Sequence, residues 1–97
     1  MTFAVILKPD AVGDLDNLRK YDAARIADAI EKHLTDEPEK VSRSRIKRLR
    51  GKQAADYRLR VGDYRVFYTV DTEEATVVVL RIFHKKETRE FYREEKP

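Results

Sequence analysis

The sequence predicts a small α+β domain in which two N-terminal helices pack on a largely antiparallel sheet, followed by a short C-terminal helix. Its 97 residues suit a single domain over residues 1–97 with one hydrophobic core. The first half carries apolar residues at helical spacing, and the second half carries the apolar and polar alternation of strands. This order of elements is typical of helices gathered on one face of a sheet.

The first predicted element is a strand over residues 2–8, where apolar side chains alternate, and Pro9 ends it. A helix should follow, capped by Asp10 or Asp14 and breaking near residues 20–21. Its apolar positions, spaced by three residues, are Val12, Leu15 and Leu18.

A second helix is predicted to begin at Asp22, whose carboxylate suits the N-cap position, and to end near residues 35–38. Apolar residues recur in it at spacings of three and four, which forms one stripe for the core. The stripe comprises Ala23, Ile26, Ala27, Ile30 and Leu34. Two antiparallel helices on a sheet are the simplest use of the two stripes.

The second half of the chain predicts strands. A short strand is expected over residues 46–50, a pair over 56–61 and 64–70, and a long strand over 75–83. The long strand is a nearly continuous apolar run, so it should be buried on both faces, in the middle of the sheet or under the helices. Residues 87–95 can form the closing helix, and the first strand must pair somewhere within the sheet.

The two residues between the paired strands, Gly62 and Asp63, predict a hairpin with a type II′ turn. That loop length sets the register, and Arg58, Arg60 and Arg65 then share one face. The facing pairs are Val61 and Tyr64, Arg60 and Arg65, Leu59 and Val66, and Arg58 and Phe67. Like charges directly opposite each other destabilise a sheet by about 0.2–1 kcal/mol, so a compensating group is expected. A carboxylate from elsewhere in the fold and a phosphate of a ligand are equally suitable.

The charge distribution points to an anionic partner. The net charge is only +3, but residues 41–65 hold nine Lys/Arg and two Asp/Glu, a local net charge of +7. Such a block on one hairpin and its lead-in argues for nucleic acid. A solvated basic face is the ordinary alternative.

Several chemistries are excluded by residues that the chain lacks. It has no cysteine, which rules out disulfides, thiolate metal sites and cysteine nucleophiles and suits a reducing cytoplasm. Its two histidines have no spaced carboxylate partners, its three glycines form no phosphate loop, and Ser42 and Ser44 lie in no nucleophile motif. The apolar start is too short for a signal peptide or a membrane span. We therefore expect a cytoplasmic protein with no cofactor, no metal and no membrane contact.

The remaining toolkit is basic and aromatic, and it suits RNA chemistry. The 2′-hydroxyl of RNA attacks the adjacent phosphate when a group removes its proton, cations stabilise the added charge, and an acid protonates the leaving oxygen. Tyr92 could act as the base or stack on a nucleobase, and Lys86 or Arg65 could stabilise the phosphorane. A histidine at a strand end, such as His84, is more often structural than catalytic. Three tyrosines share the inward face of the hairpin and are expected in the core: Tyr57, Tyr64 and Tyr68.

These residues together resemble the RelE/ParE toxin superfamily of type II toxin–antitoxin systems. The resembling segments are residues 49–51, 57–68 and 84–86, together with Tyr92. The resemblance covers nearly the whole chain and is strongest over residues 46–92. It implies a RelE-like toxin domain.

The RelE-like branch implies a ribosome-dependent mRNA endoribonuclease, or mRNA interferase, which needs no metal and is held inactive in a hetero-oligomer with a cognate antitoxin. The catalytic residues implied by this resemblance are Arg60, Arg65, Lys86 and Tyr92. The residues expected to bind RNA are Arg50, Lys52, Arg58, Arg60, Lys85 and Arg89, and His84 is a further catalytic candidate. Lys86 stands where an arginine is more usual, and lysine lacks the bidentate guanidinium fork.

Two alternatives stay open. The ParE-like branch poisons DNA gyrase and is not a nuclease; it shares the hairpin but generally lacks the full basic and tyrosine set. An inert relative that only binds RNA or an antitoxin would have much the same sequence. The set Arg58, Arg60, Arg65, Lys86 and Tyr92 favours the nuclease.

Overall fold

The elements along the chain confirm the α+β class. The computed structural model describes residues 1–51 and 54–88. In chain order the elements are β1 (Ala4–Leu7), α1 (Pro9–Asp16), α2 (Lys20–Leu34), β2 (Ile46–Arg48), β3 (Tyr57–Val61), β4 (Tyr64–Asp71), β5 (Thr76–His84) and the 3₁₀ helix η1 (Lys85–Glu87). The predicted closing helix at 87–95 falls, beyond residue 88, outside the described residues.

The helices differ from the prediction at their starts. Lys8 is the N-cap of α1 and Arg19 is the N-cap of α2, and neither makes a side-chain capping bond. The predicted caps, Asp10 or Asp14 for α1 and Asp22 for α2, were therefore wrong. α1 starts at Pro9, whose missing N–H is not needed in the first turn. Asp22 lies in the first turn of α2, where a carboxylate interacts favourably with the helix dipole, and the break between the helices falls at residues 17–19.

Some strand boundaries also shift, and the backbone explains the clearest case. Ala75 has φ of 50°, a left-handed conformation that belongs to a turn, so β5 begins at Thr76 and extends to His84. β1 is shorter than the predicted 2–8, and β2 ends at Arg48 rather than at residue 50.

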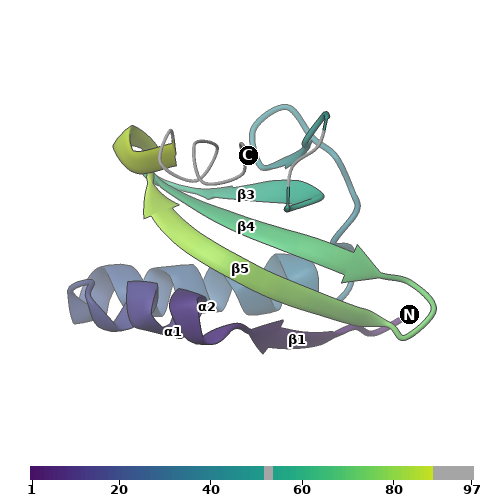
Figure 1. Ribbon diagram of the computed structural model, residues 1–97, viewed down its shortest axis with the longest axis horizontal. Coiled ribbons are helices and arrows are strands. Elements are labelled where there is room, and N and C mark those ends of the chain that lie inside the picture. Colours follow the sequence, from purple (N-terminus) through teal and green to yellow (C-terminus); the bar gives the residue numbers. More distant parts are fainter. Residues whose placement is uncertain (52–53, 89–97) are drawn as a thin grey trace.

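The five strands form one sheet in the order β1-β5-β4-β3-β2 (Figure 1). β1 runs parallel to β5, and the other neighbouring strands are antiparallel, which confirms the largely antiparallel sheet. β5 therefore lies inside the sheet, as its apolar run requires.

The hairpin of β3 and β4 has the predicted register. Its facing pairs include Val61 with Tyr64, Arg60 with Arg65, and Arg58 with Phe67. Gly62 has φ of 57°, the conformation of the first central residue in a type II′ turn. A residue with a side chain would be strained in this conformation. The tight turn thus sets which side chains of the two strands share a face.

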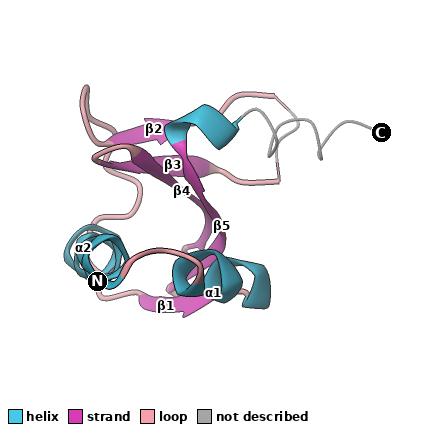
Figure 2. Ribbon diagram, turned by 90° about the vertical axis from the view of Figure 1, so that its left-hand side faces the viewer, coloured by secondary structure: helices cyan, strands magenta, loops and turns pink. Residues whose placement is uncertain are grey.

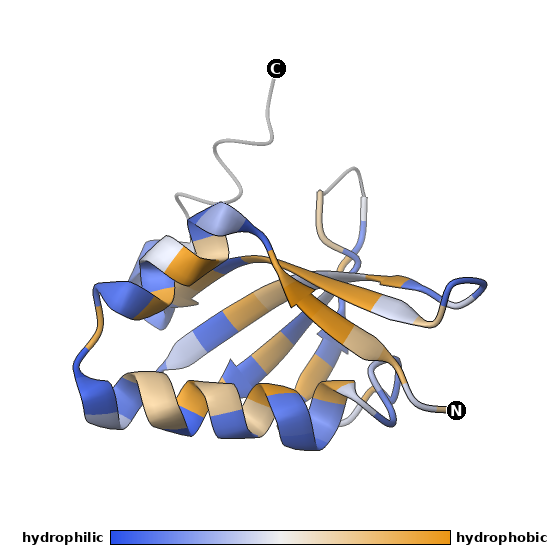
Figure 3. Ribbon diagram, turned by 90° about the horizontal axis from the view of Figure 1, so that it is seen from below, coloured by the Kyte–Doolittle hydropathy of each residue, from blue (hydrophilic) through white to orange (hydrophobic). Residues whose placement is uncertain are grey.

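The core lies between the sheet and the two helices, which cover the same face (Figure 2). Hydrophobic and hydrophilic residues alternate along α2 (Figure 3), and its buried residues are Ile26, Ile30 and Leu34. The predicted inward tyrosines Tyr57 and Tyr68 are buried, and their rings stack with centroids 5.7 Å apart.

A second, smaller cluster lies on the opposite face of the sheet. Its buried members are Ala55, Phe67 and Phe83, and Leu49 and Leu80 pack against them. β5 contributes to this cluster as well as to the main core, so the prediction that it is buried on both faces is confirmed.

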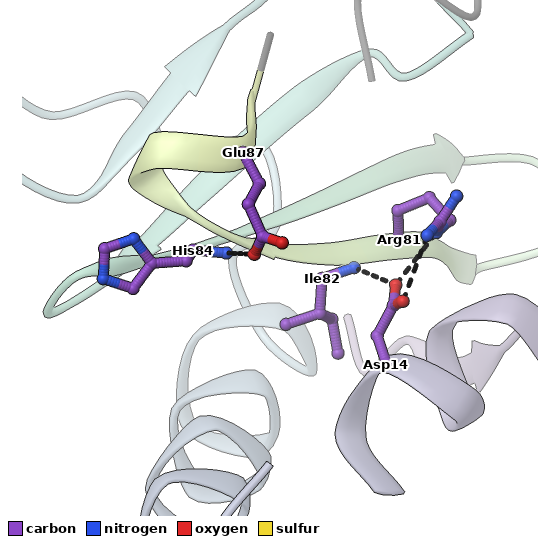
Figure 4. Close-up of polar contacts among 5 residues, drawn as sticks. All are labelled: Asp14, Arg81, Ile82, His84 and Glu87. Atoms are coloured by element: carbon purple, nitrogen blue, oxygen red, sulfur yellow. Dashed lines mark hydrogen bonds and ion pairs between the residues drawn. The ribbon is translucent and has the colours of Figure 1, made fainter. Parts of the chain in front are cut away.

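Asp14 joins α1 to the part of β5 that β1 does not reach. Its carboxylate accepts hydrogen bonds from the backbone N–H of Ile82 at 2.8 Å and from the Arg81 guanidinium at 2.9 and 3.1 Å (Figure 4). One partly buried carboxylate thereby satisfies a strand edge and an arginine together.

Candidate nucleic-acid interface

Three arginines of the hairpin share the face of the sheet that the helices leave uncovered. Arg58 and Arg60 are two residues apart in β3, and Arg65 lies directly opposite Arg60 in β4. Their strand neighbours Leu59 and Val66 point into the main core, so alternation directs the arginines to the other side. We call Arg58, Arg60 and Arg65 the arginine face.

Backbone carbonyls hold Arg65 in place opposite Arg60. Nη1 of Arg65 donates to the carbonyl oxygens of Gly62 at 3.0 Å and of Tyr64 at 2.9 Å. Burial and the nearby charges of Arg58 and Arg60 lower the pKa of Arg65. Over residues 1–51 and 54–88 no carboxylate forms an ion pair with the arginine face. The carboxylate considered from the sequence is thus not supplied by the described part of the fold.

Arg58 has an unsatisfied donor. Its Nε is buried and has no hydrogen-bond partner among the residues that the structure describes. A buried donor left unpaired costs about 1–3 kcal/mol, so an acceptor brought by a ligand would be stabilising. Phe67 in β4 lies directly opposite Arg58 and belongs to the second apolar cluster, so an aromatic ring lies next to the cations.

The residues after β5 lie beside the hairpin turn. The backbone N–H of Lys85 donates to the Asp63 carbonyl at 2.6 Å, and the Lys85 ammonium lies 3.4 Å from the Asp63 carboxylate. Lys86 is exposed in η1. The end of the last strand therefore meets the hairpin at its tip.

His84 lies on the helix-facing side of the sheet. It is opposite Tyr64 in the β4–β5 ladder, and the two rings form an edge contact with centroids 5.4 Å apart. The Tyr64 hydroxyl donates to Asp22 of α2 at 3.3 Å. Nδ1 of His84 accepts the N–H of Lys86. Glu87 accepts the N–H of His84 (Figure 4). The structure thus gives His84 a capping role, on the opposite side of the sheet from the arginine face.

Other predicted site residues are placed only in part. Arg50 is exposed in the loop after β2. Lys52, Arg89 and Tyr92 lie outside the described residues. The structure therefore brings together Arg58, Arg60 and Arg65, with Lys85 at the hairpin tip.

Two cations near this site were not predicted from the sequence. Lys47 lies opposite Arg58, and Arg81 lies opposite Phe67, in the same row across the sheet. The Arg81 guanidinium stands 4.4 Å from the centroid of the Phe83 ring. Lys47 belongs to the basic block over residues 41–65, but its place beside Arg58, like that of Arg81 beside Phe67, exists only after four strands have paired.

The described residues contain no group of three or more His, Cys, Asp or Glu side chains that could hold a metal ion. Within the same residues, no helix is long and apolar enough to cross a membrane.

Comparison with solved structures shows where this fold occurs. The toxin–antitoxin complex RelBE2 from Mycobacterium tuberculosis contains a chain 32% identical to this one, with a TM-score of 0.76, covering 87% of this chain and 92% of that chain. In the archaeal RelE–RelB complex from Pyrococcus horikoshii the identity is 29% and the TM-score 0.66, over 88% and 97% of the two chains. A mutant of the E. coli toxin RelE in the free state is 22% identical, with a TM-score of 0.72 over 98% and 95%, and shows the shared fold alone.

A family model gives the same assignment from the sequence. The model described as "ParE toxin of type II toxin-antitoxin system, parDE" matches residues 5–89. No curated protein sequence matches the chain. Because the family match spans most of its length, this chain belongs to the RelE/ParE superfamily of toxins of type II toxin–antitoxin systems.

Proposed function

We propose that this toxin is a ribosome-dependent mRNA interferase. The observation that carries the proposal is the arginine face, where three guanidinium groups lie together without a carboxylate partner among the described residues. Guanidinium forks match phosphate oxygens, so a phosphodiester would supply the missing negative charge. The proposed cleavage of RNA by its own 2′-hydroxyl needs no cofactor.

In the proposed reaction the 2′-oxygen of one nucleotide bonds to the adjacent phosphorus. The bond from that phosphorus to the 5′-oxygen of the next nucleotide breaks. A base takes the 2′-proton and an acid protonates the leaving oxygen, which yields a 2′,3′-cyclic phosphate and a 5′-hydroxyl. Arg60 and Arg65 would stabilise the extra charge on the phosphorane, assisted by Lys86, and Tyr92 would exchange the protons.

The hydrogen bonds of Arg65 support its role. Since two backbone carbonyls hold Nη1, the guanidinium is oriented before a substrate arrives. Preorganised donors stabilise developing charge without the cost of reorientation during the reaction. The adjacent arginines would attract the phosphate, and Arg50, Lys52, Lys85 and Arg89 would contact flanking nucleotides.

We also propose a cognate antitoxin as the partner, in a cytoplasmic hetero-oligomer. The similar structures from M. tuberculosis and P. horikoshii are complexes of a toxin with an antitoxin. An antitoxin segment with carboxylates could cover the arginine face, which would neutralise the same charges that bind the phosphate.

A second candidate follows from the family match. The matching model describes a ParE toxin, and the ParE-like branch acts on DNA gyrase without cleaving RNA. In that case the arginine face would contact gyrase or antitoxin carboxylates. The two candidates differ in what a cell expressing the toxin accumulates: cut mRNA or broken DNA.

The test is expression of the chain without an antitoxin. Primer extension on translated messages should show new 5′ ends inside coding regions as growth stops. Growth arrest with intact mRNA and gyrase-linked DNA breaks would support the second candidate. Growth without arrest and without cuts would contradict both.

Arg65→Ala should abolish cutting, whereas Arg65→Lys should retain a part of it because the charge remains but the fork is lost. Lys20→Ala is the matched control, since Lys20 is an exposed cation at the start of α2 on the other side of the domain. Each variant should first be shown to be folded by circular dichroism. Wild-type cutting by a folded Arg65→Ala protein would remove Arg65 from the site.

A further inference from the structure

Lys47 extends the arginine face onto the next strand. It lies directly opposite Arg58 in the antiparallel pair of β2 and β3, so the two side chains share a face of the sheet. Its neighbour Ile46 is 3% exposed and belongs to the main core, whereas Lys47 is exposed. Lys47 therefore stands on the helix-free side, beside Arg58.

The face now has two rungs of like charge. Lys47 and Arg58 form one rung, and Arg60 and Arg65 form the other. Each rung places two cations opposite each other, an arrangement that destabilises an isolated sheet. The unpaired, buried Nε of Arg58 lies in the first rung. Among the described residues no carboxylate forms an ion pair with either rung, and Asp63 attracts Arg65 only from beyond ion-pair distance.

The acidic residues of this block are already engaged elsewhere. Between residues 41 and 65 the only carboxylates are Asp56 and Asp63. Asp56 accepts the backbone N–H of Val70 at 3.2 Å, and Asp63 pairs with Lys85. A solvated basic face would need no partner, but it would not leave a buried guanidinium donor without an acceptor.

We propose that the two rungs bind two successive phosphates of one RNA strand, which runs along β3. Arg60 and Arg65 hold the scissile phosphate, and Lys47 and Arg58 hold a neighbouring one. Arg58 and Arg60 are two residues apart, about 7 Å along a strand. That separation is comparable to the spacing of adjacent phosphates in an extended single strand. Lys47 is thus an RNA-binding residue that sets the register of the message, and this role rests on the proposed function.

The test removes the charge from one phosphate at a time. Ribosomes are programmed with mRNA that carries a single methylphosphonate on the 5′ or the 3′ side of the cut, with a 2′-deoxy sugar beside it for chemical stability. The control mRNA has the same 2′-deoxy sugar and a normal phosphate. Single-turnover cleavage rates are measured for the wild type, Lys47→Ala, Lys47→Arg and the control Lys20→Ala.

On the control mRNA, Lys47→Ala should slow cleavage about tenfold, the loss of one charged contact, and Lys47→Arg should restore most of the rate. On one of the two methylphosphonate messages, the cleavage rate of the wild type should fall by a similar factor. On that message Lys47→Ala should cleave at the same rate as the wild type, because the contact is already lost. Lys20→Ala should match the wild type on every message. Lys47 is exposed, so its variants should fold.

The outcomes separate this inference from the function on which it rests. If the wild type leaves unmodified mRNA uncut on the ribosome, the proposed nuclease fails and the register with it. Two results with a wild type that cuts would show that Lys47 does not bind a neighbouring phosphate. In the first, Lys47→Ala leaves the cleavage rate unchanged. In the second, Lys47→Ala slows cleavage by its full factor on both methylphosphonate messages, in addition to the slowing that each methylphosphonate causes. Loss of the Lys47 effect at either flanking phosphate supports the proposal and identifies the direction of the strand.

Discussion

Replacing Tyr68 by Phe should test the bond that ties β4 to the loop after α2. The Tyr68 side chain is 0% exposed, and its hydroxyl donates to the carbonyl oxygen of Pro38 at 2.6 Å. The substitution removes this bond and leaves the ring in place against Tyr57. The Pro38 carbonyl would then be buried without its donor.

The expected loss of unfolding free energy is about 1–3 kcal/mol, because a buried acceptor loses its partner. That loss is a large share of the roughly 5–15 kcal/mol that stabilises a domain of this size. Equilibrium unfolding in urea measures it as a shift of the midpoint by about 1 M at unchanged slope, for a slope of about 2 kcal/mol per molar urea. Tyr21→Phe is the control, since Tyr21 is 75% exposed.

The pH dependence of the same pair of proteins adds a second test. Burial raises the pKa of Tyr68 above its usual value of 10.0. The unfolded chain therefore releases this proton first, and the contribution of Tyr68 is complete below pH 10 and is lost as the pH rises further. The loss has a limiting slope of about 1.4 kcal/mol per pH unit. The difference in unfolding free energy between the wild type and Tyr68→Phe should therefore become smaller above pH 10.

This reasoning would be refuted if the unfolding free energy of Tyr68→Phe at neutral pH lay within about 0.3 kcal/mol of the wild-type value. If the difference in unfolding free energy between the two proteins stayed constant from pH 8 to pH 11, the pKa of Tyr68 would not be raised in the folded state. A matching loss in Tyr21→Phe would mean that the assay reports something other than the buried bond.

Three further perturbations follow from contacts described above. Asp14→Ala should destabilise the domain by about 1–3 kcal/mol and speed amide hydrogen exchange at Ile82, and unchanged exchange there would contradict the edge bond. Gly62→Ala should lower the melting temperature, because its φ of 57° strains a side chain; a melting temperature equal to the wild type would exclude that strain. Arg60→Thr should stabilise the protein by about 0.2–1 kcal/mol by removing repulsion with Arg65 while lowering toxicity, and destabilisation would show that the pair is not repulsive.

Sequence reasoning predicted the hairpin with its full register, and the reason is local. A two-residue turn leaves one way to pair the flanking strands, so Arg60 must face Arg65. The helix stripes were found for a similar reason, since periodicity reports a buried face. Helix caps were not, because Asp10 and Asp22 suit a first turn as well as a cap, and Pro9 needed no capping side chain.

The candidate site was predicted in part for the same physical reason. Arg58, Arg60 and Arg65 share a face by alternation within one hairpin, which a sequence can show. The placement of His84 opposite Tyr64, away from the arginines, depends on how β5 pairs with β4. The sequence marked Lys47 only as a solvated or phosphate-steering charge of the basic block, because nothing local shows that β2 pairs with β3 in the register that places Lys47 opposite Arg58.

The sequence by itself determined the α+β class, the hairpin and its three arginines on one face, since these depend on contacts between near neighbours in the chain. The tertiary structure decided what surrounds them: the parallel place of β1 beside β5, the Asp14 bond to the open edge of β5, and the rung of Lys47 with Arg58. These features need segments that meet only on folding. Their pairing is chosen by the burial of the whole core, which no single segment encodes.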